Sequence, residues 1–88
     1  MVKVRAALES DVPLILELIR ALAEYEKLAH ACVATEAGLR HTLFGPKPYA
    51  EAIIAEWDGA AAGFALYFHN YSTFLAQPGL YLEAWVEL

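Results

Sequence analysis

Two neighbouring residues, Tyr25 and Glu26, offer the most suggestive chemistry in this chain. A carboxylate beside an aromatic ring suits an ammonium ion, through Coulomb attraction and cation–π contact. The same pair is also typical of a helix end at which a charge lies beside a tyrosine that closes the core. The residues alone therefore leave an amine contact and a structural helix end both open.

The other reactive side chains form no recognisable site. His30, His41 and His69 are too far apart for a metal pair on one helix or strand, so surface or loop positions are expected and no metal is predicted. Cys32 has no basic neighbour, which favours a buried apolar thiol over a nucleophile. No Ser-His-Asp pattern with supporting motif context is present.

Composition narrows the class of protein. The chain has 88 residues, of which 59% are hydrophobic, and a formal net charge of −5, so we expect a single folded domain over residues 1–88. No Lys or Arg follows Lys47, which argues against a nucleic-acid surface. The N-terminus lacks the apolar run of a signal peptide and no stretch approaches 18 apolar residues, so no membrane span and a cytoplasmic location are expected.

Hydrophobic periodicity and turn residues predict six elements that would position these side chains. A strand over residues 2–6 precedes a long amphipathic helix that begins near Asp11, with Ser10 or Asp11 as its cap and Pro13 in its first turn. The remaining elements are a shorter helix capped by Thr35 with Glu36 and running to about Leu43, strands over 50–57 and 60–71 joined by a tight hairpin turn at Asp58-Gly59, and a strand over 80–86. The order β-α-α-β-β-β indicates an α+β fold with an antiparallel sheet.

A dense set of aromatic residues lies in and after the third predicted strand. We expect these side chains to pack in the core rather than to stack on a ligand: Phe64, Tyr67, Phe68, Tyr71 and Phe74.

The order of elements and several strings resemble the N-terminal half of the GNAT superfamily of N-acetyltransferases, and more closely the diamine (spermidine/spermine) acetyltransferase branch. The resemblance spans nearly the whole chain. It is carried by Val4-Arg5-Ala6 with Asp11, the helix string from Ile19 to Glu26, Gly63-Phe64-Ala65-Leu66-Tyr67-Phe68, Asn70-Tyr71-Ser72-Thr73-Phe74, and Gly79-Leu80-Tyr81-Leu82-Glu83.

This resemblance implies acetyl transfer from acetyl-CoA to a small primary amine. It implies that Glu83 helps to remove the amine proton, that backbone near Glu83 to Trp85 stabilises the oxyanion, and that Trp85 and Val86 bind the cofactor. It also implies that Tyr25 and Glu26 contact the cationic substrate. Alternatively, Glu83 lies on a solvated face or rim of the sheet.

The sequence also departs from the family pattern. Ala84 follows Glu83 where similar proteins usually carry Asp, so either Asp became Ala or a residue has been lost. Ser72 and Phe74 stand where the polyamine-specific branch often has an acidic residue and Trp, which leaves another small amine open. The chain reaches Leu88 without the Gly-rich loop that would bind the pyrophosphate of coenzyme A.

We therefore expect a truncated N-terminal half that is inactive alone and binds acetyl-CoA weakly or not at all. An apolar strand over residues 80–86 with a free edge also predicts a two-fold homodimer through that strand or the hairpin before it. The alternative hypothesis is a non-catalytic, self-associating module derived from an acetyltransferase.

Overall fold

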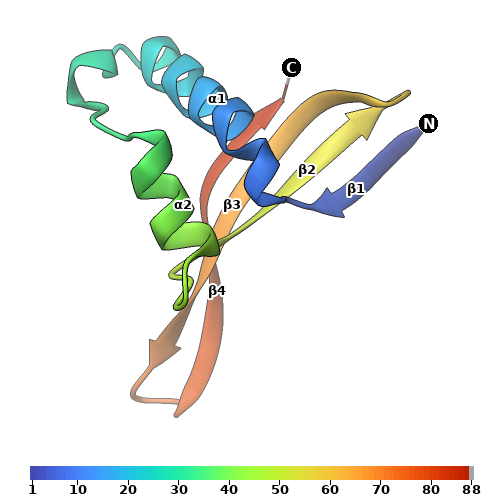
Figure 1. The fold of residues 1–88 in the computed structure, drawn as a ribbon. Helices are drawn as coiled ribbons and strands as arrows, with labels where there is room; N and C mark the ends of the chain where they lie inside the picture. Colours follow the sequence, from blue (N-terminus) through green and yellow to red (C-terminus); the bar gives the residue numbers. More distant parts are fainter. Residues whose placement is uncertain (88) are drawn as a thin grey trace.

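The computed structural model describes residues 1–87 as two helices and four strands, in the order predicted from the sequence (Figure 1). The strands are β1 (Val2–Ala6), β2 (Glu51–Trp57), β3 (Ala60–Ser72) and β4 (Gln77–Glu87), and the helices are α1 (Val12–Tyr25) and α2 (Glu36–Phe44). Neighbouring strands pair antiparallel in the order β1-β2-β3-β4. The predicted α+β class is confirmed.

Local sequence signals account for two of the connections. Asp58 and Gly59 have φ angles of 50° and 85°, the left-handed conformation that a two-residue hairpin turn between β2 and β3 requires. The Thr35 hydroxyl accepts a hydrogen bond of 3.0 Å from the Gly38 amide, which satisfies one free donor at the start of α2. Both predictions are confirmed.

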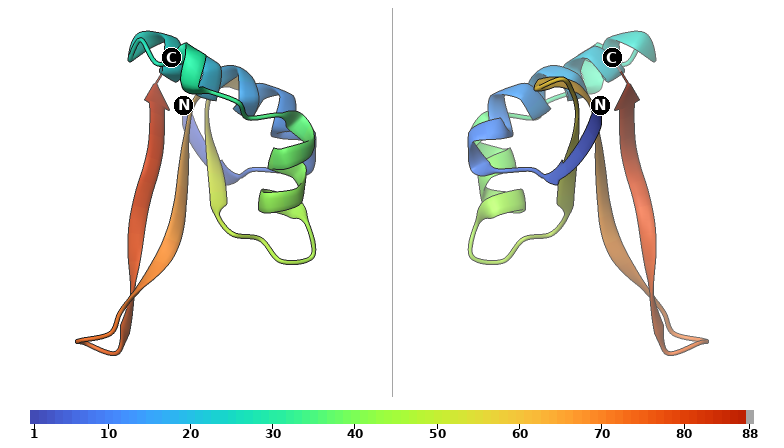
Figure 2. Two further views of the ribbon diagram at one scale, coloured as in Figure 1. Left: turned by 90° about the vertical axis from the view of Figure 1, so that its left-hand side faces the viewer. Right: turned by 90° about the vertical axis from the view of Figure 1, so that its right-hand side faces the viewer.

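Both helices lie on the same side of the sheet (Figure 2). The core forms between them and alternate residues of β2 and β3, which share that side because strand side chains alternate between faces. Its buried members are Ile15, Leu18, Leu43, Ala52, Ile54 and Phe64. The opposite face of the sheet has no helix over it among the described residues. No helix within residues 1–87 is both long and apolar enough to cross a membrane.

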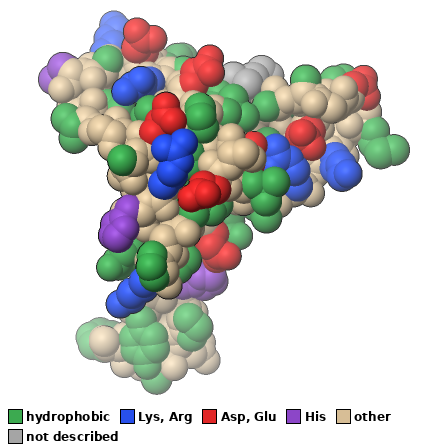
Figure 3. All heavy atoms as spheres, in the orientation of Figure 1, with side chains coloured by type: hydrophobic (Ala, Val, Ile, Leu, Met, Phe, Trp, Pro, Cys, Tyr) green, Lys and Arg blue, Asp and Glu red, His purple; other side chains and the backbone are tan. Residues whose placement is uncertain are grey.

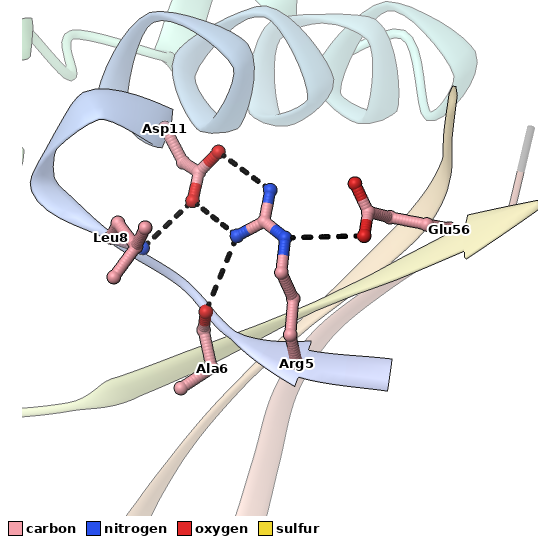
Figure 4. A network of polar contacts seen from close by, with 5 residues as sticks. All are labelled: Arg5, Ala6, Leu8, Asp11 and Glu56. Atoms are coloured by element: carbon pink, nitrogen blue, oxygen red, sulfur yellow. Dashed lines mark hydrogen bonds and ion pairs between the residues drawn. The ribbon is translucent and has the colours of Figure 1, made fainter. Parts of the chain in front are cut away.

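The turn from β1 into α1 depends on one polar network (Figure 4). Both carboxylate oxygens of Asp11 accept hydrogen bonds from the Arg5 guanidinium, at 2.7 and 3.0 Å, and one also accepts the Leu8 amide at 2.7 Å. Glu56 on β2 approaches the same guanidinium at 3.4 Å. The hydrogen bond from Arg5 holds the pKa of Asp11 below its ordinary value.

The expected side-chain cap at this helix start was wrong. Asp11 has the N-cap position of α1, but its side chain makes no capping bond to that helix. The carboxylate instead faces back toward β1, because the charged guanidinium is the stronger hydrogen-bond donor. Pro13 lies in the first turn as predicted.

The aromatic prediction holds only for Phe64. Tyr67 and Phe68 are half-buried, whereas Tyr71 and Phe74 are exposed. The connection left between the predicted strands over 60–71 and 80–86 was also too long, because β3 continues to Ser72 and β4 begins at Gln77. The two strands run beyond the helices, so these aromatic side chains have no core to enter.

Candidate active site

Glu83 lies at an irregularity in β4. The register pairs Leu66 with Ala84 and Tyr67 with Leu82, so Glu83 is an extra residue with no partner on β3. Such a β-bulge disrupts the ladder locally and changes the direction of the strand, and bulges are over-represented beside active sites. The Glu83 side chain is exposed, which is compatible with the predicted proton-transfer role and equally with the alternative of a carboxylate on a solvated rim of the sheet.

The bulge changes which face of the sheet the residues of β4 occupy. Ala84 and Val86 pack against the core on the helix side. Leu82 pairs with Tyr67 and therefore lies on the opposite face. Because β4 is an edge strand of the described sheet, its backbone near Glu83 faces no neighbouring strand on its outer side.

Trp85 and Val86 meet in one shallow depression. It has a volume of about 340 Å³. Most of its lining lies on the face away from the helices, namely Val2, Val4, Ile53, Ala55, Gly63, Ala65 and Trp85, and Ala62, Phe64 and Val86 complete the lining. Trp85 pairs with Ala65 and remains exposed beside this depression. The two predicted cofactor-binding residues are consecutive in the sequence, and both line this depression, beginning two residues after Glu83.

Tyr25 and Glu26 lie at the C-terminal end of α1, and both are exposed. Tyr25 is 86% exposed, so the alternative that this tyrosine closes the core is wrong. Neither residue lines the depression at Trp85. The described residues therefore place the predicted amine contacts and the predicted cofactor contacts in two separate places.

The histidines and the cysteine behave as surface and packing residues. His30, His41 and His69 are all exposed, as expected, and Cys32 is half-buried rather than fully buried. His69 Nδ1 lies 3.9 Å from a carboxylate oxygen of Glu51, and both side chains are open to solvent. Within residues 1–87, no group of three or more His, Cys, Asp or Glu side chains could hold a metal ion.

Comparison with known proteins identifies similar enzymes over nearly the whole chain. No family model matches it. Thialysine N-epsilon-acetyltransferases of Bos taurus and Mus musculus are 39% and 37% identical over 93% and 92% of the chain. An L-ornithine N5-acetyltransferase of Arabidopsis thaliana is 29% identical over 92% of it. The chain spans about half the length of these relatives, 52–55%.

Solved structures agree on the architecture. A ribosomal-protein-alanine N-acetyltransferase from Brucella melitensis biovar Abortus 2308 superposes with a TM-score of 0.73 at 17% identity, over 99% of this chain and 56% of that one. A possible acetyltransferase from Clostridium difficile 630 gives a TM-score of 0.75 at 12% identity, over 99% and 57%. The chain has the fold of about half a GNAT N-acetyltransferase. The resemblance found in the sequence is confirmed.

The bulge is a feature of this fold that sequence reasoning missed. Apolar residues recur at every second position, Leu80, Leu82, Ala84 and Val86, which predicts one continuous face. No Gly or Pro marks the interruption at Glu83. Only the pairing register with β3 shows that this alternation is broken.

Proposed function

We propose that this chain contributes the amine-binding and proton-transfer half of an N-acetyltransferase that acts on a small, diamine-like primary amine. The observation that carries the proposal is the bulge at Glu83, which puts an exposed carboxylate at an unpaired strand position two residues before Trp85. The relatives support it, because their names describe acetylation of ornithine and thialysine nitrogens.

Glu83 has the proton-transfer role in this proposal. A primary amine is protonated near neutral pH and attacks a carbonyl only after losing a proton, so a positioned carboxylate, acting directly or through a water, accelerates the step. Backbone N–H groups of β4 around the bulge supply hydrogen bonds to the oxygen that becomes negative during transfer. An edge strand suits this role because its outer N–H groups have no strand partner among the described residues.

Tyr25 and Glu26 have the recognition role. They place an aromatic ring and a carboxylate next to each other at an exposed helix end, where a second ammonium group of a diamine could bind. Both side chains are solvated, so we expect each contact to contribute modestly to affinity.

Acetyl-CoA, the acetyl donor of this proposal, supplies an activated thioester when bound. The free edge of β4 and the apolar depression at Trp85 and Val86 fit its acyl end. Residues 1–88 contain no Gly-rich loop for its phosphates, and their last basic residue is Lys47. We therefore assign only the acyl end of the donor to this part of the fold.

A chimera tests the proposal. Residues 1–88 would replace the matching segment of the Bos taurus thialysine N-epsilon-acetyltransferase, and thiol release from acetyl-CoA would be followed with diamines and ornithine. We expect activity, a loss in kcat of about 100-fold or more in Glu83→Gln, and a raised KM for the amine in Glu26→Gln. Glu51→Gln, a change at another exposed strand glutamate, is the control and should leave both constants unchanged.

Two results would contradict the proposal: a folded chimera without activity, or a Glu83→Gln variant as active as its parent. The unmodified polypeptide of residues 1–88 distinguishes the alternative of a non-catalytic module. We expect it to show no turnover and to bind coenzyme A no more tightly than about 1 mM by calorimetry, because the phosphate contacts are missing. Micromolar binding would show that other residues hold the phosphates.

A further inference from the structure

The strand β4 has two possible registers against β3, and they differ by one residue. The part of β4 after Glu83 is fixed, because Ala84 and Val86 pack against the core. If strict pairing continued outward from Ala84, Glu83 would pair with Tyr67 and no residue would be left over. We call this alternative the slipped register, and we call the observed pairing, in which Glu83 is unpaired, the bulged register.

The alternation of apolar residues in β4 favours the slipped register. That register would put Leu80 and Leu82 on the helix side, in line with Ala84. It would also remove the bulge, which leaves one residue out of the ladder. The connection between the strands would lengthen from residues 73–76 to residues 73–77, and one more loop residue costs little. The bulged register therefore needs a stabilising contact that the slipped register lacks.

Charge pairs do not supply this contact. Oppositely charged partners across two strands can stabilise one register over another. Residues 67–82, which form the outer part of the hairpin, contain no Asp, Glu, Lys or Arg, and the outer end of the hairpin shows no charged side chain in Figure 3. The register of β4 against β3 must therefore depend on backbone pairing and on the packing of uncharged side chains.

Two aromatic rings distinguish the registers. Phe68 and Tyr81 are strand partners in the bulged register, and their ring centroids lie 5.1 Å apart, within the range of favourable aromatic pairs. Phe68 is on the helix side, where it lines the same depression as Leu43 and Phe44 of α2. In the slipped register Phe68 would face Leu82, and Tyr81 would move to the opposite face of the sheet. The ring contact therefore exists only in the bulged register.

We propose that the Phe68–Tyr81 ring pair selects the bulged register, and that both residues are therefore positioning residues for Glu83. The ring pair lies on the outer side of the bulge, and core packing anchors β4 on the inner side, so the extra residue is held between two fixed points. Without the ring contact, β4 slips by one residue and Glu83 becomes an ordinary member of the ladder. The effect on catalysis rests on the proposed function, whereas the choice of register does not.

Nuclear Overhauser contacts between side chains of residues 1–88 report the register directly. Leu80 lies opposite His69 in the bulged register and would lie opposite Asn70 in the slipped register. We expect the parent and Tyr81→Phe to show the Leu80–His69 contacts alone. Tyr81→Val should also show Leu80–Asn70 contacts, with the ratio of slipped to bulged register raised by about 10-fold. Tyr71→Val, at a tyrosine without an aromatic strand partner, is the matched control and should keep the contacts of the parent.

The chimera with the Bos taurus enzyme gives the kinetic test, and it decides the question if Tyr81→Val fails to fold as residues 1–88. Tyr81→Val should lower kcat in proportion to the loss of the bulged register. The KM for the amine should stay unchanged, because the proposed amine contacts, Tyr25 and Glu26, lie at the end of α1. Tyr81→Phe should restore kcat, since it keeps the ring and removes only the hydroxyl.

Several results would overturn the proposal. One is a Tyr81→Val chain in which Leu80 contacts His69 alone, and another is a parent in which Leu80 contacts Asn70. In the chimera, equal losses of kcat in Tyr81→Val and Tyr71→Val, or a loss in Tyr81→Phe, would overturn it as well. A Glu83→Gln chimera as active as its parent would contradict the proposed function alone, because the side-chain contacts report the register without acetyl transfer.

Discussion

Replacing Asp11 by Asn should destabilise the fold far more than the same replacement at another ion-paired aspartate. Asp11 is 12% exposed and holds the guanidinium of Arg5, itself 30% exposed, through two hydrogen bonds of 2.7 and 3.0 Å. It also accepts the Leu8 amide, so one carboxylate fixes the end of β1 and the start of α1 together. Asn has a similar shape but turns an N–H₂ group toward the guanidinium.

The magnitude follows from the bonds that are lost. A hydrogen bond to a charged group contributes about 1.5–3 kcal/mol, and the two guanidinium contacts act as one bidentate unit. We expect a loss of about 2–3 kcal/mol, because Asn keeps one acceptor oxygen. Domains of this size have a free energy of unfolding of roughly 4–13 kcal/mol, so the loss is a substantial fraction of it and lowers Tm by about 10–20 °C.

Asp58→Asn is the control. Asp58 also forms an ion pair at 3.0 Å, with the amino group of Met1, but the two groups are 71% and 95% exposed. Asn tolerates the positive φ of this turn position as well as Asp does. Urea unfolding followed by circular dichroism should therefore show no change for Asp58→Asn. Equal effects of the two variants would refute the reasoning from burial.

The free energy of unfolding that is lost in Asp11→Asn should depend on pH. The folded-state pKa of Asp11 is lowered by its hydrogen bond from Arg5, so its stabilising effect is fully present above the unfolded value of about 3.9 and is lost as pH falls through the folded pKa. The gap between the parent and Asp11→Asn should be constant from about pH 7 to pH 5 and shrink below about pH 4. A gap that stays constant in acid would contradict this assignment.

Three further substitutions test local features of the fold by the same unfolding assay. Gly45→Ala should cost about 1–3 kcal/mol, because a Cβ there would overlap the His41 carbonyl oxygen at the end of α2. Ala76→Gly should stabilise the fold by up to about 1 kcal/mol, since Ala76 has a φ of 53° in the turn between β3 and β4; a loss of stability would contradict the inferred backbone strain at Ala76. Thr35→Ala should cost about 1 kcal/mol through loss of its bond to the Gly38 amide, and Thr35→Ser should restore most of it.

The order of elements was predictable because each is marked by local chemistry. Each of these signals depends only on residues that are close together in the sequence. They are the alternation of apolar and polar residues over 2–6, the apolar residues of α1 at steps of three and four, and the Asp58-Gly59 turn. The length of the β3–β4 hairpin was less predictable. Asn70 and Gly79 are typical loop residues, yet here they pair with each other across the hairpin. Gly79 fits this position because a Cβ there would overlap the Asn70 side chain.

The candidate site was predictable in its residues but not in its geometry. The resemblance selected Glu83, Trp85 and Val86, and the structure places the last two at one depression. Glu83 is unpaired because of the register of β4 with Leu66 and Tyr67 of β3. The residues around Glu83 do not encode this register, because it depends on a second strand. The role of Asp11 was missed for the same reason, because its partner Arg5 lies on a different element.

The bulge at Glu83 connects the candidate active site with the outer part of the β3–β4 hairpin. Without an extra residue, strict alternation would put Leu80, Leu82, Ala84 and Val86 on one face, and that face would be the helix side, where Ala84 and Val86 now pack. The extra residue moves Leu80 and Leu82 to the opposite face of the sheet, where both are exposed. The same irregularity therefore leaves an exposed carboxylate unpaired and puts two leucines on the face away from the helices. One inserted residue thus decides which face of the sheet each of these β4 side chains occupies.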